Sequence, residues 1–457
     1  MPSEREPAPE PTGLLTGWGR TAPTLAHLIG ADDRDLLAER VKRSDGRGVI
    51  GRGLGRSYGD AAQNAGGLVV EATSSAGIIS LDIENAIATV RAGTSLDQLM
   101  EWLVPLGFFV PVTPGTRTVT VGGAIAADIH GKDHHVGGSW CNHVESFRLL
   151  TADGSILDVN KVQHPDIFWA TAGGMGLTGI VLDATFHLKP IESSMLMVDT
   201  DRAINLEDCM RMLSEGDDRY DYSVAWIDLV ATGKQMGRSI LDRGRFAKFD
   251  ELDAKHRAKP LAFTSTQLAT APPMPGGLLN KASLRAFNEL WYRKSPWRKR
   301  DHLVSIGGFF HPLDLVRDWN RIYGPRGFVQ WQYVVPFESS EVVEQTVQRI
   351  SETGYSSFLA VLKRFGPGNE GHLSFPQGGW TLAVDIPARP GLGAILDELD
   401  LLVAGCGGRV YLAKDSRMRG ELVGTMYPRL GEWQAIRNEL DPEHHFQSDM
   451  SRRLHLC

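Results

Sequence analysis

Short apolar runs bounded by turn residues dominate the first 190 positions of the chain. The segments GVIGRG, GGLVVEA, GIISLDIENAIATVRAGTS, GFFVPVTPG and IVLDATFHL each show the pattern of a strand, with glycine or proline nearby. Helical spacing predicts helices among them at residues 32–44 and 95–107. Many short strands with few long helices predict an α+β fold and not a regular alternation of strand and helix.

The pattern changes after about residue 190. Strands are predicted at YSVAWIDLV, HLVSIGGFF, GFVQWQYVVP and GWTLAVDIP, and amphipathic helices at SSEVVEQTVQRISETG and LGAILDELDLLVAG. These elements imply an antiparallel sheet backed by helices. Residues 255–300 contain APPMPGG and predict a mobile loop or lid, and the tail after residue 408 has a strand and a helix of its own.

Composition places the chain among ordinary globular proteins. Its 457 residues allow two or three domains of the usual ~100–200 residues, and 42% hydrophobic content is enough for a core. Fifty of the 457 residues are glycine, which is a larger share than the usual ~7%. This glycine content favours tight turns and close backbone approaches, as in a loop-rich cofactor binder. The net charge of −7 gives no support for a nucleic-acid partner.

Neither a disulfide framework nor a secretion signal is indicated. The four cysteines lack C-x-x-C spacing, so we interpret them as reduced or structural. The opening stretch MPSEREPAPEPTG is polar and proline-rich, and no later stretch approaches the ~18 apolar residues that span a bilayer. We expect a soluble protein, cytoplasmic by this criterion, whose contact with a membrane is peripheral.

A basic and aromatic stretch lies between Lys281 and Arg300. It has one acid, Glu289, among the cations Lys281, Arg285, Arg293, Lys294, Arg298, Lys299 and Arg300, interleaved with Leu284, Phe287, Leu290, Trp291, Tyr292 and Trp297. This mixture suits a surface that meets an anionic amphiphile or a membrane face. A solvated helix with some core aromatics is the alternative, and the sequence leaves both open.

The first candidate for chemistry is the glycine-rich turn IGRGLGRSYGDAAQNAGG. Gly51, Gly53 and Gly55 permit positive φ and expose successive N–H groups, and Arg52 and Arg56 add charge, which makes a nest suited to a pyrophosphate. A dinucleotide-binding Rossmann loop is not supported, because the spacing lacks its third glycine and AAQNAGG reads as a turn where a helix is required. A glycine turn without a ligand is the alternative.

The second candidate is PGTRTVTVGGAIAADIHGKDHH, residues 114–135. Its small side chains would let a flat ring system and a phosphate tail lie against the backbone, although GGAIAA could equally serve close packing of a helix on a sheet. If His130 and His134 lay on one helix, their spacing would suit a divalent metal, with His135 as a further ligand. The HGK sequence favours a turn, which argues against that site.

The third candidate is Lys414, which emerges from a predicted strand in VYLAKDSR. Such a lysine is either a surface charge or a desolvated group whose lowered pKa lets it act near neutrality. Position alone favours the surface charge.

Four separated motifs, in order and over nearly the whole chain, carry a family resemblance. They are GRGLGRSYGDAAQN, PGTRTVTVGGAIAADIHG, GGMGLTGIV and the C-terminal DPEHHFQSDMSRRL. Together they resemble the vanillyl-alcohol-oxidase type of FAD-binding flavoproteins. ADIHGK, NELWYRKS and YLAKDSR narrow the resemblance to the decaprenylphosphoryl-β-D-ribose 2-oxidase family, the flavin subunits of a two-protein epimerase that supplies arabinose for cell-wall arabinan.

The resemblance implies a two-domain α+β fold with a PCMH-type FAD-binding domain. Residues 1–192 and 409–457 would form this domain around an antiparallel-sheet substrate domain at 193–408, whose mobile loop lies at about 260–300. The FAD positions carried over are Gly51, Arg52, Gly53, Leu54, Gly55, Arg56, Ser57, Tyr58, Gly59, Asp60, Ala61, Gly115, Thr120, Val121, Gly122, Gly123, Ala127, Asp128, Ile129, His130, Ile180 and Tyr411. Relatives with covalent flavin often carry a histidine on the first glycine turn, where this chain has Arg56, so we expect non-covalent FAD.

The same resemblance implies oxidation of a ribose 2-hydroxyl, in which a base removes the proton while a hydride passes to the flavin. Lys414 would hold or deprotonate the hydroxyl, with His130 beside the flavin. The substrate-pocket positions carried over are Tyr58, Lys132, Trp226, Phe310, Arg321, Gln330, Gln332, Lys363, Phe365, Ala383 and Lys414, of which Lys132, Arg321 and Lys363 offer charge for a phosphate.

Two of these positions depart from the family pattern. Ala383 stands where many relatives carry a cysteine that nitroaromatic inhibitors modify covalently, so we expect no such adduct here. Phe310 replaces a pocket tyrosine and removes one hydroxyl donor.

We therefore expect FAD-dependent oxidation of decaprenylphosphoryl-β-D-ribofuranose to its 2-keto intermediate, the first half of epimerisation to the arabinose compound. The expected partners are this lipid-linked sugar phosphate, a separate NADH-dependent reductase and the plasma-membrane surface, on its cytoplasmic or its periplasmic side. No metal and no nucleic acid are expected. The alternatives are an oxidase of a soluble aldose, alditol or aldonolactone, a non-catalytic protein with this fold, and a metal hydrolase at His130, His134 and His135.

Overall fold

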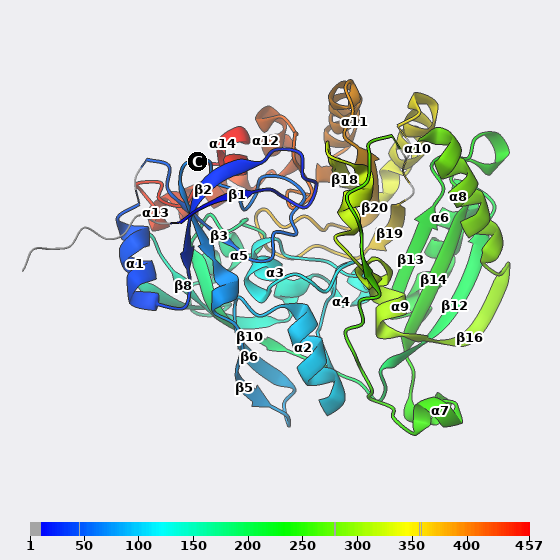
Figure 1. The fold of residues 1–457 in the computed structure, drawn as a ribbon, viewed down its shortest axis with the longest axis horizontal. Coiled ribbons are helices and arrows are strands. Elements are labelled where there is room, and N and C mark those ends of the chain that lie inside the picture. Colours follow the sequence, from blue (N-terminus) through cyan, green and yellow to red (C-terminus); the bar gives the residue numbers. More distant parts are fainter. Residues whose placement is uncertain (1–10, 45, 278–279, 356, 358) are drawn as a thin grey trace, which may run out of the picture.

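The computed structural model describes residues 11–44, 46–277, 280–355, 357 and 359–457, so most of the proline-rich start lies outside it. The N-terminal part and the C-terminal tail lie together on the left of Figure 1, and a large sheet from the middle of the chain lies on the right. Helices and antiparallel sheets occur in both parts, which confirms the predicted α+β class.

A four-stranded sheet leads the chain into the glycine-rich turn. Its order is β1–β2–β4–β3, with bounds Thr12–Leu15, Thr24–Gly30, Leu68–Glu71 and Val49–Arg52. Strands β2 and β3 both run parallel to β4, and helix α1 (Arg34–Lys42) connects β2 to β3 with Leu37 and Val41 buried. Because β3 ends at Arg52, the turn begins at the end of a fixed strand.

A five-stranded antiparallel sheet forms the body of the N-terminal part. Its order is β5–β6–β10–β8–β9, with bounds Ile78–Asp82, Ile87–Arg91, Ile180–His187, Val144–Leu150 and Ile156–Asn160. Helix α3 (Val121–Ala126) contacts β10. Helices α2 (Leu96–Leu103), α4 (His134–Gly137) and α5 (Pro165–Thr171) complete this part, and β7 (Phe108–Phe109) pairs with β11 (Lys189–Pro190).

An eight-stranded sheet forms the other part, and each of its strand pairs is antiparallel. Its order is β16–β12–β14–β13–β19–β20–β18–β21, with bounds Arg298–Ser305, Met195–Ala203, Ser239–Phe246, Tyr222–Ile227, Ala360–Phe365, Gly379–Pro387, Phe328–Val335 and Arg409–Val410. The short strands β15 (Ala269–Thr270) and β17 (Val316–Arg317) pair in parallel. The predicted antiparallel sheet is therefore present.

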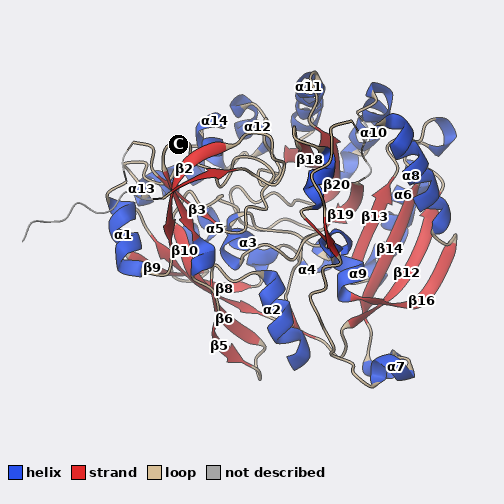
Figure 2. Ribbon diagram, viewed as in Figure 1, coloured by secondary structure: helices blue, strands red, loops and turns tan. Residues whose placement is uncertain are grey.

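Helices cover this sheet, as Figure 2 shows. Helix α6 (Leu206–Gly216) contacts β12, β13, β14 and β19, and α11 (Leu392–Gly405) contacts β18 and β21. The remaining helices of this part are α7 (Ala254–Arg257), α8 (Lys281–Lys294), α9 (Ile306–Phe310) and α10 (Glu341–Thr353). The amphipathic helices predicted before and after β20 correspond to α10 and α11.

Two predictions for this part are wrong in detail. In HLVSIGGFF the strand stops at Ser305, whose hydroxyl accepts from the backbone N–H of Gly308 and starts α9. Residues 260–300 are not one loop, because α8 and the start of β16 occupy residues 281–294 and 298–300. The mobility expected for the remaining segment stays a prediction.

The C-terminal tail returns to the N-terminal part directly after β21. The N–H of Tyr58 donates to the carbonyl of Ala413 at 3.0 Å, and the N–H of Val49 donates to that of His445 at 2.7 Å. Helices α12 (Val423–Met426), α13 (Leu430–Leu440) and α14 (Asp449–Arg453) follow, with α13 against α5. The tail thus places Lys414 next to the glycine-rich turn.

Candidate functional site

The glycine-rich turn forms one wall of a cavity between the two parts of the molecule. Gly55 has a φ of +63°, and a Cβ on Gly53 would lie 2.2 Å from Thr120 Oγ1, so both positions require glycine. Arg52 turns back under the loop and donates to the carbonyls of Thr16 and Ala62. The arginine therefore fixes the shape of the turn.

The backbone N–H groups of residues 54–57 donate to no acceptor in the part of the chain that the structure describes. Four successive N–H groups that line a cavity form a concave site for an anion. This arrangement fits the pyrophosphate predicted for the turn.

The opposite wall comes from residues 113–131. Thr120 caps α3 by accepting from the N–H of Gly123 at 3.2 Å, which brings the small residues of this helix to the cavity. Gly115 lines the cavity, and a Cβ there would meet no atom within 4 Å. The cavity is therefore bounded here by backbone and small side chains, as the slot hypothesis requires.

Most residues predicted for the cofactor line this cavity. They are Gly51, Arg52, Gly53, Leu54, Gly55, Arg56, Ser57, Tyr58, Ala61, Gly115, Thr120, Gly122, Gly123, Ala127, Ile129, His130, Ile180 and Tyr411. The others, Gly59, Asp60, Val121 and Asp128, lie behind this lining. A Cβ on Gly59 would lie 2.0 Å from the carbonyl oxygen of Asp415, and Val121 is buried in the core.

The two aspartates of this group, Asp60 and Asp128, bind side chains and backbone from other segments of the chain. Asp60 forms an ion pair with Arg453 of the tail, at 2.7 Å. Asp128 is fully buried and accepts from the hydroxyls of Ser139 and Ser374 and from the N–H of Cys141. Their carboxylates fix the walls and do not face the cavity.

His130 lies at the centre of the site, in the segment between α3 and α4. Its ring is packed among Phe365, Phe375 and Tyr411, with centroids 4.7, 5.8 and 5.5 Å away. Burial is the main reason that the pKa of His130 lies well below its ordinary value, and the neighbouring Lys363 lowers it further. The imidazole is therefore neutral at physiological pH.

Three lysines converge on the same space from different elements. Lys132 donates to the carbonyl of Phe309, Lys363 donates to that of Gly131 at 3.2 Å, and Lys414 lies 4.1 Å from the centroid of the Tyr58 ring. Burial, the largest cause, lowers the pKa of Lys132 and of Lys414 to about 8 and that of Lys363 to about 7. Lysines with lowered pKa values in a cavity are typical of a functional site and not of a surface.

A polar network lies behind Tyr58 and Lys414. The buried carboxylate of Asp385 accepts from the amide of Gln330 and, at 3.5 Å, from the hydroxyl of Tyr323. Burial raises the pKa of Asp385 to about 7, and its negative charge in turn raises the pKa of Lys414. This aspartate was missed from the sequence, although strand alternation in GWTLAVDIP places it on the same face as Ala383.

The predicted substrate residues divide into two groups. Tyr58, Lys132, Phe310, Gln330, Gln332, Lys363, Ala383 and Lys414 line the cavity, whereas Trp226, Arg321 and Phe365 do not. Phe365 packs edge-on against the ring of His130, and Arg321 forms an ion pair with Asp318 at 2.7 Å. On β13 the lining residue is Val224, two positions before Trp226.

Arg321 therefore does not supply charge to this cavity. Further lining residues that the sequence did not single out include Trp18, Thr113, Val361 and Trp319. Trp18 stacks on the guanidinium of Arg56, with 4.2 Å to the ring centroid. These contacts join segments far apart in the sequence, and no local pattern indicates them.

The two departures from the family pattern both face the cavity. Phe310 packs its ring against Phe109 and Tyr222, at centroid distances of 5.3 and 4.8 Å. Ala383 pairs with Gln332 on one neighbouring strand and with Val361 on the other. A side chain at position 383 would therefore be directed beside Gln332 and toward the cavity.

The histidines are not arranged for a metal. His130 lies before α4, and His134 is the first residue of that helix, so the two do not share a helical face. Burial lowers the pKa of His134 to about 3, and the ring of His135 contacts the carbonyl of Tyr220. Among the described residues, no group of three or more His, Cys, Asp or Glu side chains is placed to hold a metal ion.

Comparison with known proteins is consistent with this geometry. Residues 27–160 match a family model described as an FAD binding domain. The chain is 47% identical over 454 residues to decaprenylphosphoryl-β-D-ribose oxidase of Mycolicibacterium smegmatis, covering 98% of each chain. It is 40% identical over 372 residues to an uncharacterised protein of Streptomyces coelicolor, covering 79% of this chain and 100% of the relative. An FAD-linked oxidoreductase of Aspergillus ruber is 28% identical over 190 residues, covering 40% of this chain and 37% of the relative.

The cofactor of this protein is FAD. The matched family model covers the glycine-rich turn and α3, which are the walls with free N–H groups and small side chains. These residues fit a pyrophosphate on the turn and a flat ring against backbone.

Proposed function

The chain belongs to the decaprenylphosphoryl-β-D-ribose oxidase family, and on that premise we propose that it oxidises the 2-hydroxyl of decaprenylphosphoryl-β-D-ribofuranose to a 2-keto group. The observation that carries the proposal is the position of three lysines and two glutamines at one cavity with the FAD turn. Lysines suit the phosphate, and amides suit the sugar hydroxyls.

The residues of the site have distinct tasks in this reaction. Bound FAD supplies the acceptor for the hydride that leaves carbon 2. Lys414 is placed to hold or deprotonate the 2-hydroxyl, and Gln330 orients the sugar from strand β18. Lys132, held by the carbonyl of Phe309, offers a cation for the phosphate.

The FAD is non-covalent in this proposal. Arg56 stands where relatives with attached flavin carry a histidine, and a guanidinium cannot form that bond. Its side chain is used otherwise, since it donates to Thr118 Oγ1 and to the carbonyl of Leu54. Acid or heat denaturation is expected to release all the flavin into the supernatant.

A second enzyme must consume the product. A 2-keto sugar becomes the epimer of its precursor when a hydride is added from the opposite face, which requires a reductase with a nicotinamide cofactor. We propose that a separate NADH-dependent reductase completes the epimerisation to decaprenylphosphoryl-arabinose, for cell-wall arabinan, with this chain as the oxidising subunit.

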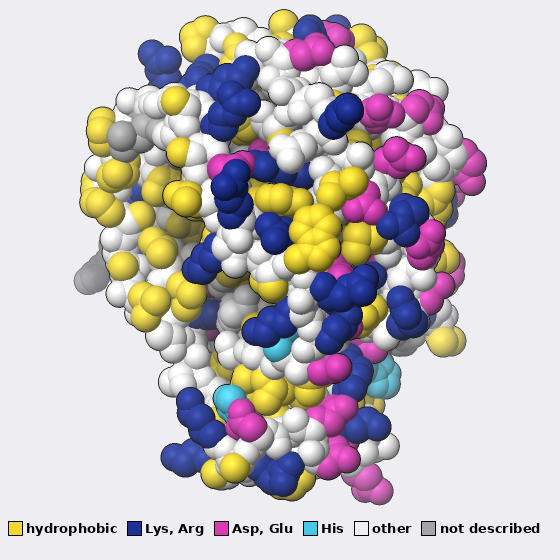
Figure 3. All heavy atoms as spheres, turned by 90° about the vertical axis from the view of Figure 1, so that its right-hand side faces the viewer, with side chains coloured by type: hydrophobic (Ala, Val, Ile, Leu, Met, Phe, Trp, Pro, Cys, Tyr) yellow, Lys and Arg dark blue, Asp and Glu magenta, His cyan; other side chains and the backbone are white. Residues whose placement is uncertain are grey.

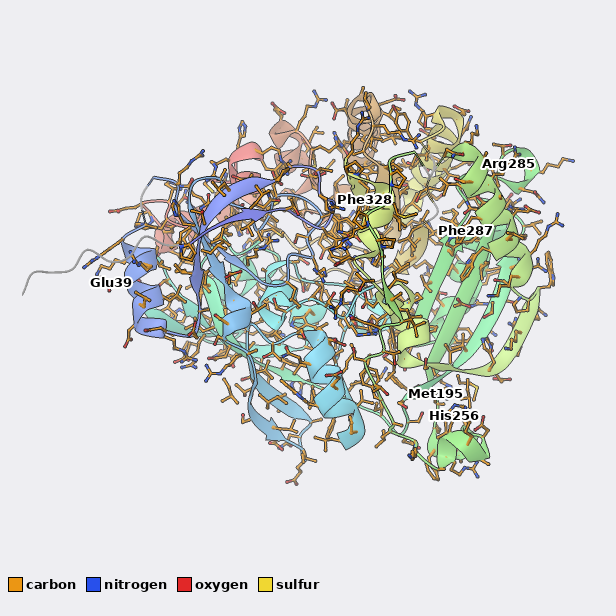
Figure 4. The ribbon with its side chains drawn as sticks, viewed as in Figure 1. Glu39, Met195, His256, Arg285, Phe287 and Phe328 are labelled. Atoms are coloured by element: carbon orange, nitrogen blue, oxygen red, sulfur yellow. The ribbon has the colours of Figure 1, made fainter. Side chains whose placement is uncertain are left out.

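We propose that the protein works at the surface of the plasma membrane. The outer face of α8 exposes Phe287, Leu290 and Trp291, with 44, 71 and 43% of each residue accessible. On the side of the molecule that carries α8 and β16, Figure 3 shows hydrophobic and basic side chains next to one another. In Figure 4, Arg285 and Phe287 project from α8 at the right, well away from Phe328 between the two parts.

An anionic bilayer suits this face, since aromatic and aliphatic side chains enter the headgroup region while Lys281, Arg285 and Lys294 meet the phosphates. Among the described residues, none of the helices is both long and apolar enough to cross a bilayer. A polyprenyl substrate would therefore be reached from the membrane surface.

The substrate class is tested by turnover with an artificial electron acceptor. Farnesylphosphoryl-β-D-ribofuranose is compared with soluble aldoses, alditols and aldonolactones at equal concentration. Faster turnover of the lipid-linked ribose supports the proposal. Turnover of the soluble sugars alone would assign the chain to the alternative oxidase class, and protein that takes up no flavin would point to a non-catalytic role.

A further inference from the structure

Both ring nitrogens of His130 face nitrogen atoms that ordinarily donate hydrogen bonds. Nε2 lies 3.0 Å from the amide nitrogen of Gln332, and Nδ1 lies 3.3 Å from Nζ of Lys363. A neutral imidazole has one N–H donor and one acceptor nitrogen, so these two neighbours cannot both donate to it.

The orientation of Gln332 decides which neighbour accepts. Its amide nitrogen also lies 3.2 Å from Thr381 Oγ1, and the hydroxyl of Thr381 donates to the carbonyl of Tyr333 at 2.8 Å. A carbonyl can only accept, so the proton of Thr381 is committed and its oxygen must accept from Gln332. The NH₂ group of Gln332 therefore faces both Thr381 and His130, and Nε2 of His130 is an acceptor.

The proton of the neutral imidazole then lies on Nδ1 and points at Lys363. An ammonium has no lone pair and cannot accept this N–H, whereas a free amine can. A free amine also keeps two N–H donors, one of which satisfies the contact from Nζ of Lys363 to the carbonyl of Gly131. The hydrogen bonds around His130 are consistent with an uncharged Lys363.

From this geometry we propose that His130 holds Lys363 as an uncharged amine, and that this amine accepts the proton of the substrate 2-hydroxyl. The inference rests on the proposed function and deepens it. The O–H bond breaks, and its proton forms a new N–H bond on Lys363. The electron pair of the carbon 2–hydrogen bond leaves the sugar as a hydride, for which bound FAD supplies the acceptor, and the C=O bond forms.

The neighbours of Lys414 and those of Lys363 favour opposite protonation states for the two side chains. Lys414 faces the ring of Tyr58 and the carboxylate of Asp385, both of which favour an ammonium. Lys363 faces Lys132, Lys414, His130 and His134, and the carboxyl of Asp133 is the acid that opposes them. The cations around Lys363 favour its amine form, and the Asp385 carboxylate and the Tyr58 ring favour the ammonium form of Lys414, which assigns Lys363 as the base and Lys414 as the charged donor.

His130 acts in this proposal as a positioning residue. Its lone pair is used by Gln332 and its N–H by Lys363, so neither is available to the substrate.

The protonation of Lys363 is tested by ¹⁵N NMR of the holoenzyme with ¹⁵Nζ-labelled lysine, and the signal is assigned by its loss in Lys363→Met. We expect it to titrate near pH 7 and to titrate at higher pH in His130→Phe, which removes the N–H donor. His135→Phe, outside the cavity, is the control and leaves the midpoint unchanged. A Lys363 signal that stays in the ammonium form up to pH 9 would overturn the proposal.

The proton-acceptor role is tested by anaerobic flavin reduction with farnesylphosphoryl ribose. Lys363→Ala should slow the reduction by ~10²–10⁴-fold, and added primary amines should restore it in proportion to their basicity. Lys132→Ala, measured in parallel, should show no such dependence on basicity. A Lys363→Ala enzyme with the wild-type rate would refute the base assignment. If the wild type itself stays oxidised, the substrate proposal fails, while the NMR titration still decides the protonation of Lys363.

Discussion

Single side chains set the electrostatics of the site. Some of them were placed correctly from the sequence and others were not. Lys132, Lys363 and Lys414 were identified by resemblance and line the cavity, although position alone favoured a surface charge for Lys414. Trp226 and Arg321 were placed in the pocket but lie outside its lining. A motif identifies a segment, whereas the direction of each side chain depends on its contacts in the fold, and Arg321 pairs with Asp318 three residues earlier.

At this scale Asp385 is expected to control one limb of the pH profile of flavin reduction. If Lys363 must be neutral and Lys414 charged, the rate rises through pH 7 and falls through pH 8. The Asp385 carboxylate raises the pKa of Lys414, so Asp385→Asn lowers that pKa and moves the alkaline limb to lower pH. Asp400→Asn, a buried carboxyl outside the cavity lining, is the control and leaves the limb in place. If the alkaline limb of Asp385→Asn lies at the wild-type pH, then Asp385 does not set the pKa of Lys414.

Ala383 is expected to decide the response to nitroaromatic inhibitors. The described cysteines, Cys141, Cys209, Cys406 and Cys457, all lie outside the lining of the cavity. During turnover the wild type should gain no inhibitor mass, whereas Ala383→Cys should gain one adduct at that residue, detected by peptide mass spectrometry. An adduct on the wild type, or none on Ala383→Cys, would contradict the placement of position 383 at the cavity.

Elements were predicted best where their pattern is local. The strand at β18 and the helices α10 and α11 follow directly from alternation and helical spacing. The run IGGFF could not be distinguished from a strand, because the cap at Ser305 that starts α9 depends on one hydroxyl. The stretch after residue 280 was expected to belong to a mobile loop, with a solvated helix as the alternative. It is a helix, with Leu284, Asn288 and Tyr292 on its buried side.

The exposed face of α8 is expected to govern membrane binding. Leu290→Ser with Trp291→Ser should weaken binding to vesicles that contain anionic lipid by ~10-fold or more, because about 0.8 kcal/mol is lost for each CH₂ group that no longer leaves water. Ile83→Ser, exposed on the N-terminal part, is the matched control. Arg298 and Arg300 are unsuitable for this test, since both pair with Asp201. Equal vesicle sedimentation for the double variant and the control would remove α8 as the docking face.

At the scale of the whole molecule, the site depends on contacts that close the chain on itself. The order of the eight-stranded sheet places β21 from residues 409–410 beside β18, and the tail then crosses to the glycine-rich turn. The resemblance implied this return, but hydrophobic periodicity did not, because strand order depends on long-range pairing and not on local spacing.

Arg453 is expected to be the strongest polar link between the tail and the turn. It pairs with Asp60 at 2.7 Å and with Asp415 at 2.8 Å, and the side chain of Asp415 is only 3% exposed. Arg453→Met leaves both carboxylates without their cation and should lower the free energy of unfolding by about 3–5 kcal/mol and weaken FAD retention. Arg349→Met breaks an exposed pair with Glu398 and should cost about 0–1 kcal/mol in the same urea titration. Equal losses for the two variants would show that the tail is held by packing alone.

The most direct test of the account is anaerobic incubation of the holoenzyme with farnesylphosphoryl-β-D-ribofuranose, without any added acceptor. Loss of the absorbance of oxidised flavin, with one sugar losing the hydrogen of carbon 2 and the proton of its hydroxyl for each flavin reduced, is the predicted result. Flavin that stays oxidised with the lipid-linked ribose but is reduced by a soluble sugar would contradict the central claim.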